Sequence, residues 1–208
     1  MRAEIVVFDG FEDLDATGPL NVLGIAGFDV GLVTAAPRDL VVSALGTRVV
    51  PAGTLSGAAD VVVVPGGGWL DRGGAGAWAE AQRGELPRAL AGAAAGGAVL
   101  ASVCTGALLL GAAGLLEDRP AVTNAAALDD LAATGALVDA AARVVDDGAI
   151  VTSGGLTAGI DLALRLVERF CGAVRAREVA RELEYPGVGG VRRPLAESPD
   201  VLAAVAEL

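Results

Sequence analysis

Apolar positions along the chain form short continuous runs that alternate with longer helical stretches. Four of these runs lack a regular polar alternation and predict buried strands, which cover residues 3–8, 28–35, 60–68 and 98–103. A further run over residues 142–153 predicts a hairpin that turns at Asp147-Gly148. Strands of this kind are buried on both faces of a sheet.

Helical segments separate these strands. Composition and spacing predict helices over residues 20–27, 78–96, 105–116, 157–171 and 174–185. Gly84 and Pro87 indicate a break or kink inside the second of them. Ser198-Pro199-Asp200 is typical of the start of a last helix, with serine as the cap and proline at the first position.

The alternation of strands and helices predicts the fold class. Apolar strands that alternate with helices favour an α/β fold with a mostly parallel sheet and helices on both faces. No repeat, linker or low-complexity segment divides the 208 residues, so we expect a single domain over 1–208. Ligands of such folds bind at the carboxyl ends of the strands.

One uncharged stretch, from Ala98 to Leu116, is nearly long enough to span a bilayer. It contains the sequence Ser-Val-Cys-Thr-Gly at 102–106, where the predicted strand gives way to the predicted helix. A strand-to-helix turn there leaves two buried elements, neither of which can span. We therefore expect no membrane segment.

The same turn carries Cys104. The pattern Ser102-x-Cys104-x-Gly106 resembles the elbow that presents a nucleophile between a strand and a helix, where small flanking residues prevent clashes. A helix that starts directly after the thiol is expected to lower its pKa. The alternative is an inert cysteine buried in the core. Cys171, which ends an amphipathic helix, is predicted to be structural.

Composition limits the partners of such a thiol. The chain has no histidine, which excludes Cys-His and Ser-His pairs and histidine-bound metals, so a carboxylate, a cationic side chain or a helix dipole must activate it. The net charge of −11 argues against a nucleic-acid partner. The N-terminal apolar run is too short for a signal peptide, so we expect a cytoplasmic protein without a disulfide.

The segment "DLDATGP" (13–19) offers a carboxylate. Asp15 can either cap the following helix or lie in the loop after the first strand. Pro19 is tolerated only in the first turn of a helix, so Thr17 or Gly18 is the better cap. This places Asp15 in the loop, at the carboxyl end of the first strand.

Glycines end two of the predicted strands. Gly66, Gly67 and Gly68 can expose backbone N–H groups as an anion or oxyanion hole beside the thiol, or simply form a turn. Gly154 occupies a similar place in "TSGGLTAG" (152–159), where Thr157 as a helix cap is the alternative explanation. Neither run matches a dinucleotide fingerprint or a P-loop.

Taken in order, these segments resemble the ThiJ/PfpI superfamily, with its class I glutamine-amidotransferase-like fold, and most closely its isocyanide hydratase (isonitrile hydratase) branch. The motifs that carry the resemblance run from the first strand to "LEYP" at 183–186 and include "LDATGP" at 14–19, "PGG" at 65–67, "SVCTGALLLGAAGLL" at 102–116 and "DGAIVTSGGLTAGIDLAL" at 147–164. The resemblance implies a flavodoxin-like α/β sandwich, usually a homodimer, with the cysteine at a nucleophile elbow.

The resemblance also implies roles. Cys104 becomes the nucleophile, Asp15 the general acid/base, and Thr105 helps to hold the intermediate. Gly66, Gly67, Gly68, Trp69, Asn124 and Gly154 become substrate-binding residues. Many relatives carry histidine and tryptophan where this chain has Asn124 and Ala125, which puts protease, glyoxalase and deglycase activities in doubt; Trp69 can offset part of the lost aromatic surface.

The activity expected from the resemblance is the hydration of a small-molecule isocyanide to an N-substituted formamide through a cysteine thioimidate. Such a hydro-lyase needs neither a metal nor an organic cofactor. Two alternatives remain. One is a redox or stress protein in which Cys104 is oxidised; the other is a non-catalytic domain that binds a small molecule.

Overall fold

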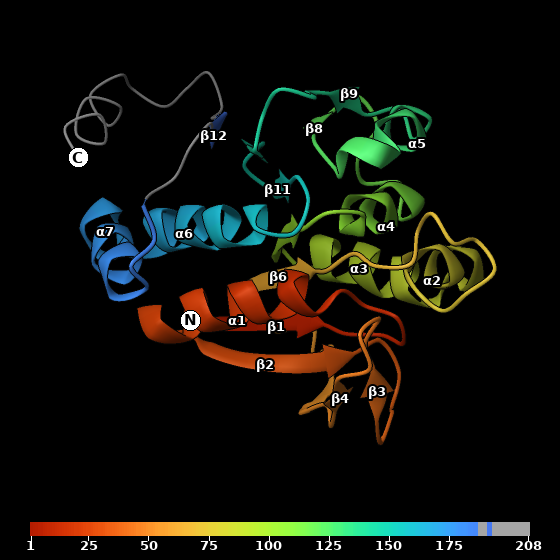
Figure 1. The fold of residues 1–208 in the computed structure, drawn as a ribbon, viewed down its shortest axis with the longest axis horizontal. Coiled ribbons are helices and arrows are strands. Elements are labelled where there is room, and N and C mark those ends of the chain that lie inside the picture. The colour runs from red at the N-terminus through yellow and green to blue at the C-terminus, as the bar shows by residue number, and fades with distance from the viewer. Residues whose placement is uncertain (187–190, 193–208) are drawn as a thin grey trace.

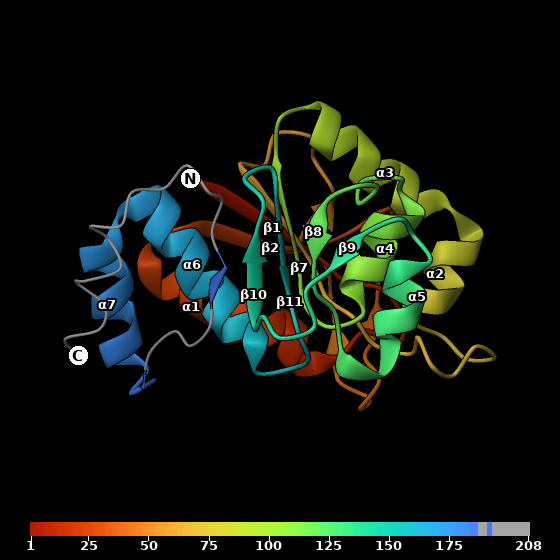
Figure 2. The same ribbon diagram turned by 90° about the horizontal axis from the view of Figure 1, so that it is seen from above.

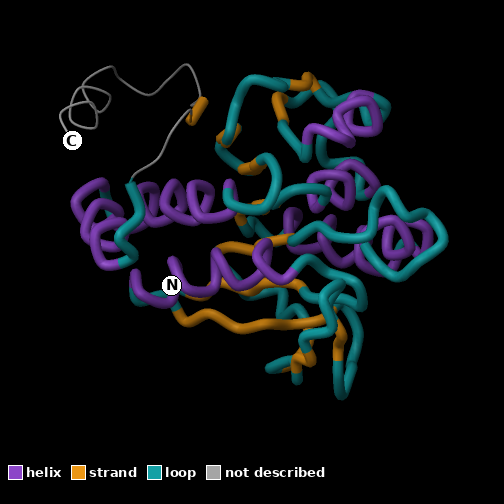
Figure 3. Tube along the Cα trace, in the orientation of Figure 1, coloured by secondary structure: helices purple, strands orange, loops and turns teal. Residues whose placement is uncertain are grey.

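The computed structural model describes residues 1–186 and 191–192 (Figures 1 and 3). Its strands are β1 Arg2–Val6, β2 Asp29–Thr34, β3 Val41–Val42, β4 Arg48–Val49, β5 Gly53–Thr54, β6 Val61–Val64, β7 Val99–Ser102, β8 Pro120–Ala121, β9 Leu137–Val138, β10 Val144–Asp146, β11 Ile150–Ser153 and β12 Val191–Arg192. Its helices are α1 Asp13–Ala26, α2 Ala77–Arg83, α3 Glu85–Ala95, α4 Gly106–Ala112, the 3-10 turn η1 Ala125–Ala127, α5 Leu128–Ala132, α6 Ala158–Cys171 and α7 Ala173–Glu182. The helix predicted from Ser198 lies outside the described residues.

A central sheet in the order β12-β10-β11-β7-β6-β1-β2-β5 organises the fold. Its strands pair in parallel except for β10 and β11, which form the predicted hairpin around Asp147-Gly148. The four valines of β6 are fully buried. Continuous apolar strands therefore lie at the centre of a mostly parallel sheet, as the sequence predicts.

Helices cover both faces of this sheet. Helices α1, α6 and α7 pack together, and α2, α3, α4 and α5 pack in a second group. Figure 2 shows the two groups on opposite sides of the strands. The flavodoxin-like α/β sandwich is thus confirmed. No described helix has the length and apolar character that crossing a membrane requires.

The first helix differs from the prediction. We expected a helix over residues 20–27, but α1 begins at Asp13 and continues past Pro19. Proline has no N–H to donate to the carbonyl four residues earlier, so Pro19 removes one hydrogen bond of the helix. The helix persists because α1 packs along α6 and buries residues such as Val22 and Leu23. Tertiary packing here outweighs the local cost of Pro19.

Short elements also escaped prediction, namely β3, β4, β5, β8, β9, β12, η1 and α5. Each has only two to five residues, which is too few to show a hydrophobic period. The predicted break in the helix over 78–96 is confirmed, because Gly84 adopts φ 72° and separates α2 from α3.

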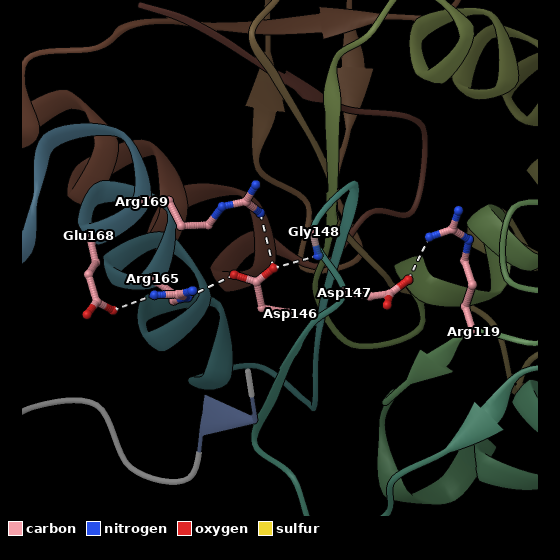
Figure 4. A network of polar contacts seen from close by, with 7 residues as sticks. All are labelled: Arg119, Asp146, Asp147, Gly148, Arg165, Glu168 and Arg169. Atoms are coloured by element: carbon pink, nitrogen blue, oxygen red, sulfur yellow. Dashed lines mark hydrogen bonds and ion pairs between the residues drawn. The ribbon is translucent and has the colours of Figure 1, made fainter. Parts of the chain in front are cut away.

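A buried ion network fixes α6 to the hairpin (Figure 4). The Asp146 carboxylate on β10 accepts hydrogen bonds from Arg165 Nε at 2.8 Å and from Arg169 Nη1 at 3.1 Å. Arg165 also donates to Glu168 at 2.9 Å. The side chains of Asp146 and Arg165 are almost fully buried, so each charge depends on the other for compensation, and the contact holds the C-terminal half of α6 against β10.

Candidate functional site

Cys104 stands on a strained turn between β7 and α4. Its φ is 54°, a left-handed value that side chains other than glycine seldom adopt. The backbone N–H of Cys104 donates to Gly154 O at 2.9 Å and to Ser153 O at 3.2 Å, and its carbonyl accepts from Thr123 Oγ1 at 2.7 Å. These bonds hold the turn in its strained form, and the predicted strand–elbow–helix arrangement is present.

Gly106 shows why the elbow needs a small residue two positions after the thiol. A Cβ at this position would lie 2.1 Å from the carbonyl oxygen of Val64 and 2.9 Å from that of Pro65. Real atoms cannot approach so closely, so β6 and the first turn of α4 can pack at this distance only with glycine.

Asp15 lies in the first turn of α1 and is fully buried. Our expectation that it lies in the preceding loop was wrong, because the helix extends across Pro19. Oδ2 of Asp15 accepts a hydrogen bond from the Gly66 N–H at 3.0 Å. Oδ1 is also buried but has no hydrogen-bond partner among the described residues. A buried carboxyl oxygen left open in this way favours the protonated form.

Burial raises the pKa of Asp15 from its usual 3.8 to about 7. The hydrogen bond from Gly66 opposes this rise, the charge of Glu12 adds to it, and the neighbouring Cys104 thiol lowers it slightly. Near neutral pH the carboxyl group can therefore both hold and release a proton, as a general acid/base must.

The pKa of the Cys104 thiol is raised, whereas we predicted that the helix after it would lower this pKa. Burial, and then the charge of Asp15, raise its pKa from 9.0 to about 11. The backbone N–H of Thr105, the side-chain amide of Asn124 and the backbone N–H of Leu156 each bond to the sulfur and lower the pKa, but by less. Helix α4 has only seven residues, and its start does not overcome desolvation.

Asn124 reaches the sulfur in a fixed orientation. It precedes η1, and its Oδ1 accepts a hydrogen bond from the Ala126 N–H at 2.9 Å. With the oxygen engaged in this way, the amide N–H₂ is left to face Cys104. Asn124 thus supplies a hydrogen-bond donor that cannot act as a base.

The first two backbone amides of the glycine run are engaged by the protein itself. The N–H of Gly66 is used by Asp15, and the N–H of Gly67 donates to Thr105 Oγ1 at 3.1 Å. Gly68 adopts φ 64° and turns the chain towards Ala75. These first two amides therefore hold the side chains of Asp15 and Thr105 and are not free for a substrate anion.

Two further predicted residues, Trp69 and Gly154, are also engaged by the protein itself. The Trp69 indole N–H donates to Asp130 Oδ2 at 2.6 Å, and only 7% of the residue is exposed. Gly154 accepts from the Cys104 N–H and donates to the Arg143 carbonyl at 3.1 Å. The indole N–H of Trp69 and the backbone groups of Gly154 thus bond to other residues of the chain.

Sequence reasoning missed Leu156, whose N–H bonds to the sulfur of Cys104. Its φ is 45°, and 43% of its surface is exposed. Nothing in the residue type signals this conformation, since leucine disfavours it. Only its place directly after Gly154-Gly155, at the end of β11, could have drawn attention to it.

The assembled groups are one thiol, one carboxyl group and several N–H donors. Within residues 1–186 and 191–192, no three histidine, cysteine, aspartate or glutamate residues gather as a metal site would require. The arrangement can form a covalent bond to carbon through sulfur, move a proton through Asp15, and stabilise negative charge on sulfur through hydrogen bonds.

Comparisons with known proteins agree with this geometry. The model of the DJ-1/PfpI family matches residues 1–169. The chain is 38% identical over 190 residues to isonitrile hydratase of Pseudomonas putida, covering 89% of this chain and 78% of that protein. It is 27% identical to the Parkinson disease protein 7 homolog of Danio rerio, over 89% of this chain and 95% of that one. The crystal structure of a ThiJ/PfpI family protein from Pseudomonas syringae superposes with a TM-score of 0.79 at 28% identity, over 99% and 86% of the two chains.

Proposed function

The chain belongs to the DJ-1/PfpI family, and on that premise we propose that it is a cofactor-independent enzyme that hydrates isocyanides to N-substituted formamides. The observation that carries the proposal is the buried Cys104–Asp15 pair, in which a carboxyl group with a pKa of about 7 adjoins the thiol. The 38% identity to an isonitrile hydratase supports the choice of substrate class.

In the first step the sulfur of Cys104 attacks the terminal carbon of the isocyanide R–N≡C. Asp15 takes the thiol proton and delivers it to the same carbon, which carries the lone pair released by the attack. One C–S and one C–H bond form, and the product is the thioimidate R–N=CH–S–Cys104. A carboxyl group with a pKa near the working pH suits this transfer, because it binds and releases the proton with similar ease.

In the second step water hydrolyses the thioimidate. The Asp15 carboxylate takes a proton from water as the oxygen adds to the carbon, and then passes that proton to the imine nitrogen. Asp15 next takes the hydroxyl proton of the tetrahedral intermediate and passes it to sulfur as the C–S bond breaks, and R–NH–CHO leaves. Atoms balance as one isocyanide plus one water to one formamide.

The remaining polar groups stabilise sulfur and the intermediate. The N–H groups of Thr105, Leu156 and Asn124 bond to the sulfur and stabilise the thiolate as it forms and leaves. The Thr105 hydroxyl accepts from Gly67, so its own hydrogen is free to be donated to the substrate nitrogen. We assign Thr105 and Asn124 these two supporting roles.

The pair works as one acid with two protons. Between pH values of about 7 and 11 it carries a single negative charge, which can sit on the carboxylate or, after proton transfer, on sulfur. The reactive form, thiolate beside carboxylic acid, has the same net charge as the resting form. It therefore forms by a proton shift within the pair, without a base from solvent.

A redox function of Cys104 is the second candidate, favoured by the similarity to the Parkinson disease protein 7 homolog. Redox-sensing thiols are usually accessible and have a low pKa, whereas Cys104 is 7% exposed and its pKa is raised. Mild peroxide followed by peptide mass spectrometry separates the two functions. Selective oxygen gain at Cys104 in a protein that turns over no isocyanide would favour the redox function.

We also propose that the protein is a homodimer. Four apolar side chains of the hairpin β3–β4 and its flanks are exposed on its surface: Leu40, Val42, Leu45 and Val50. Apolar side chains gathered in this way commonly mark an interface. Sedimentation equilibrium of the wild type should give twice the mass of the chain, and charged substitutions at Leu45 and Val50 should shift it towards the monomer.

The activity is tested by mixing the pure protein with p-nitrophenyl isocyanide and following the appearance of the formamide by its absorbance. Turnover that requires Cys104 supports the proposal. A protein that consumes no isocyanide, or a Cys104→Ala variant as active as the wild type, contradicts it.

A further inference from the structure

We propose that Asp130 is a positioning residue for this site: by binding Trp69 and Arg72 it fixes the glycine loop, residues 65–76, so that its amides stay on Asp15 and Thr105. The residue lies on α5 and contacts neither Cys104 nor Asp15 through any hydrogen bond described. The proposal rests on the proposed role of Asp15. Its test uses thiol chemistry and fluorescence in place of isocyanide turnover, so the two can fail separately.

The contacts of Asp130 form a compact cluster. Its Oδ2 accepts from the Trp69 indole N–H at 2.6 Å, and Arg72 Nη2 lies 3.1 Å from Oδ1 and 3.2 Å from Oδ2. The guanidinium of Arg72 lies 4.3 Å from the centre of the Trp78 ring. The two tryptophan rings meet edge to face with their centres 5.0 Å apart. A single carboxylate thus joins two residues of the glycine loop to α5.

The position of Trp69 in the chain connects this cluster to the candidate site. Trp69 follows Gly68 directly, and the preceding glycines donate to Asp15 Oδ2 and Thr105 Oγ1. On the other side, Asp130 belongs to the segment that begins with Asn124, whose amide bonds to the sulfur. The Trp69–Asp130 bond therefore holds together the two segments that supply hydrogen bonds to the acid/base and to the thiol.

Burial determines whether the bond of Asp130 to Trp69 or its ion pair with Arg72 contributes more to holding the loop. The Arg72 side chain is 55% exposed and that of Asp130 is 32% exposed, so their ion pair alone contributes little. The indole of Trp69 is largely buried, and its N–H would lose its only described acceptor without Asp130. We therefore expect removal of the acceptor to displace Trp69 and, with it, the Gly66 amide.

The test measures alkylation of Cys104 by iodoacetamide against pH in a Cys171→Ser background, where Cys104 is the sole thiol. In the wild-type site the rate should rise with pH and flatten near pH 7, because the ionised Asp15 raises the thiol pKa. The flat region should vanish in Asp15→Asn. In Asp130→Ala it should move upwards by about 0.5 pH unit, since a weaker Gly66 bond favours protonated Asp15.

Matched variants and fluorescence make the result decisive. Asp129→Asn, on an exposed neighbour in α5, should leave the profile unchanged, and Asp130→Asn should lie nearer the wild type because its amide oxygen still accepts from Trp69. Both tryptophans of the chain lie in this cluster, so their emission reports on it directly, and it should change in Asp130→Ala.

An altered emission with an unshifted flat region would overturn the proposal, as would an equal shift in Asp129→Asn. If Asp130→Ala does not fold, Asp130→Leu and Asp130→Ser take its place. An unshifted flat region in either of these variants overturns the proposal in the same way. A wild-type profile with no flat region would contradict the proposed role of Asp15 itself.

Discussion

The carboxyl group of Asp15 lies close enough to the thiol of Cys104 for its charge to raise the pKa of that thiol. The two groups come from the first helix and from the elbow, and the fold buries both. Each proton in the site therefore belongs to the pair, and removing one partner changes the acidity of the other in a direction that can be measured.

Replacing Asp15 by asparagine should make the thiol more acidic while abolishing hydration. The charge that raises the Cys104 pKa is lost, so at pH 9 iodoacetamide should react with Cys104 several-fold faster, on the order expected for a pKa lowered by half a unit or more. Isocyanide turnover should fall by roughly 10²- to 10⁴-fold, because the proton carrier is gone. Parallel losses of alkylation and turnover would contradict this account.

The raised pKa of Asp15 should also appear in the stability of the protein. Between pH 4 and 7 the folded chain keeps a proton that the unfolded chain releases, because the folded pKa of about 7 exceeds the usual 3.8. This stabilisation is complete below pH 4 and is lost as the pH rises through 7, by about 4 kcal/mol at most. Urea unfolding at pH 4.5 and 7.5 should show the loss in wild type and a much smaller one in Asp15→Asn. Equal pH dependence of the two proteins would show that Asp15 ionises normally.

Asn124→Asp tests the donor at the sulfur. A carboxylate at position 124 cannot donate a hydrogen bond to the sulfur, and it adds a negative charge beside it. The pKa of Cys104 should therefore rise further, and alkylation of the thiol should slow about tenfold. The matched control is Asn21→Asp, the same change at the chain's other asparagine, which is exposed on α1. Equal alkylation rates in both variants would remove Asn124 from the site.

Gly106→Ala tests the elbow. The added methyl group would lie 2.1 Å from the Val64 carbonyl oxygen, so we expect a loss of roughly 3 kcal/mol in the free energy of unfolding. Gly92→Ala is the control, because its methyl group meets nothing within 4 Å in helix α3 and should stabilise by about 0.5–1 kcal/mol. Similar free energies of unfolding for the two variants, measured by urea denaturation, would mean that the close contact at Gly106 is relieved easily.

Local pattern was enough to predict much of the fold and to identify Cys104 and Asp15 as candidate site residues. The continuous apolar runs gave the main strands, and the spacing of Ser102, Cys104 and Gly106 predicted the elbow. The absence of histidine directed attention to a carboxylate, and Asp15 is the one beside the thiol. These features depend on residues close in sequence or on composition, which a single chain displays directly.

The rest depends on packing between distant segments. Pro19 suggested that α1 starts later in the chain than it does. The contacts of α1 with α6 stabilise the longer helix, and they leave no pattern in the local sequence. The raised pKa of Cys104 results mainly from burial, which the sequence around the elbow does not report. Trp69 and Asp130 lie 61 positions apart, so their bond could be found only once the chain was folded.

The most direct test of the central claim compares initial rates of formamide release from p-nitrophenyl isocyanide by the wild type, Cys104→Ala and Cys171→Ala. The account predicts turnover by the wild type and by Cys171→Ala, which lacks only an exposed thiol, and no turnover above the uncatalysed rate by Cys104→Ala. Turnover by Cys104→Ala at the wild-type rate, or its absence in the wild type, would contradict it.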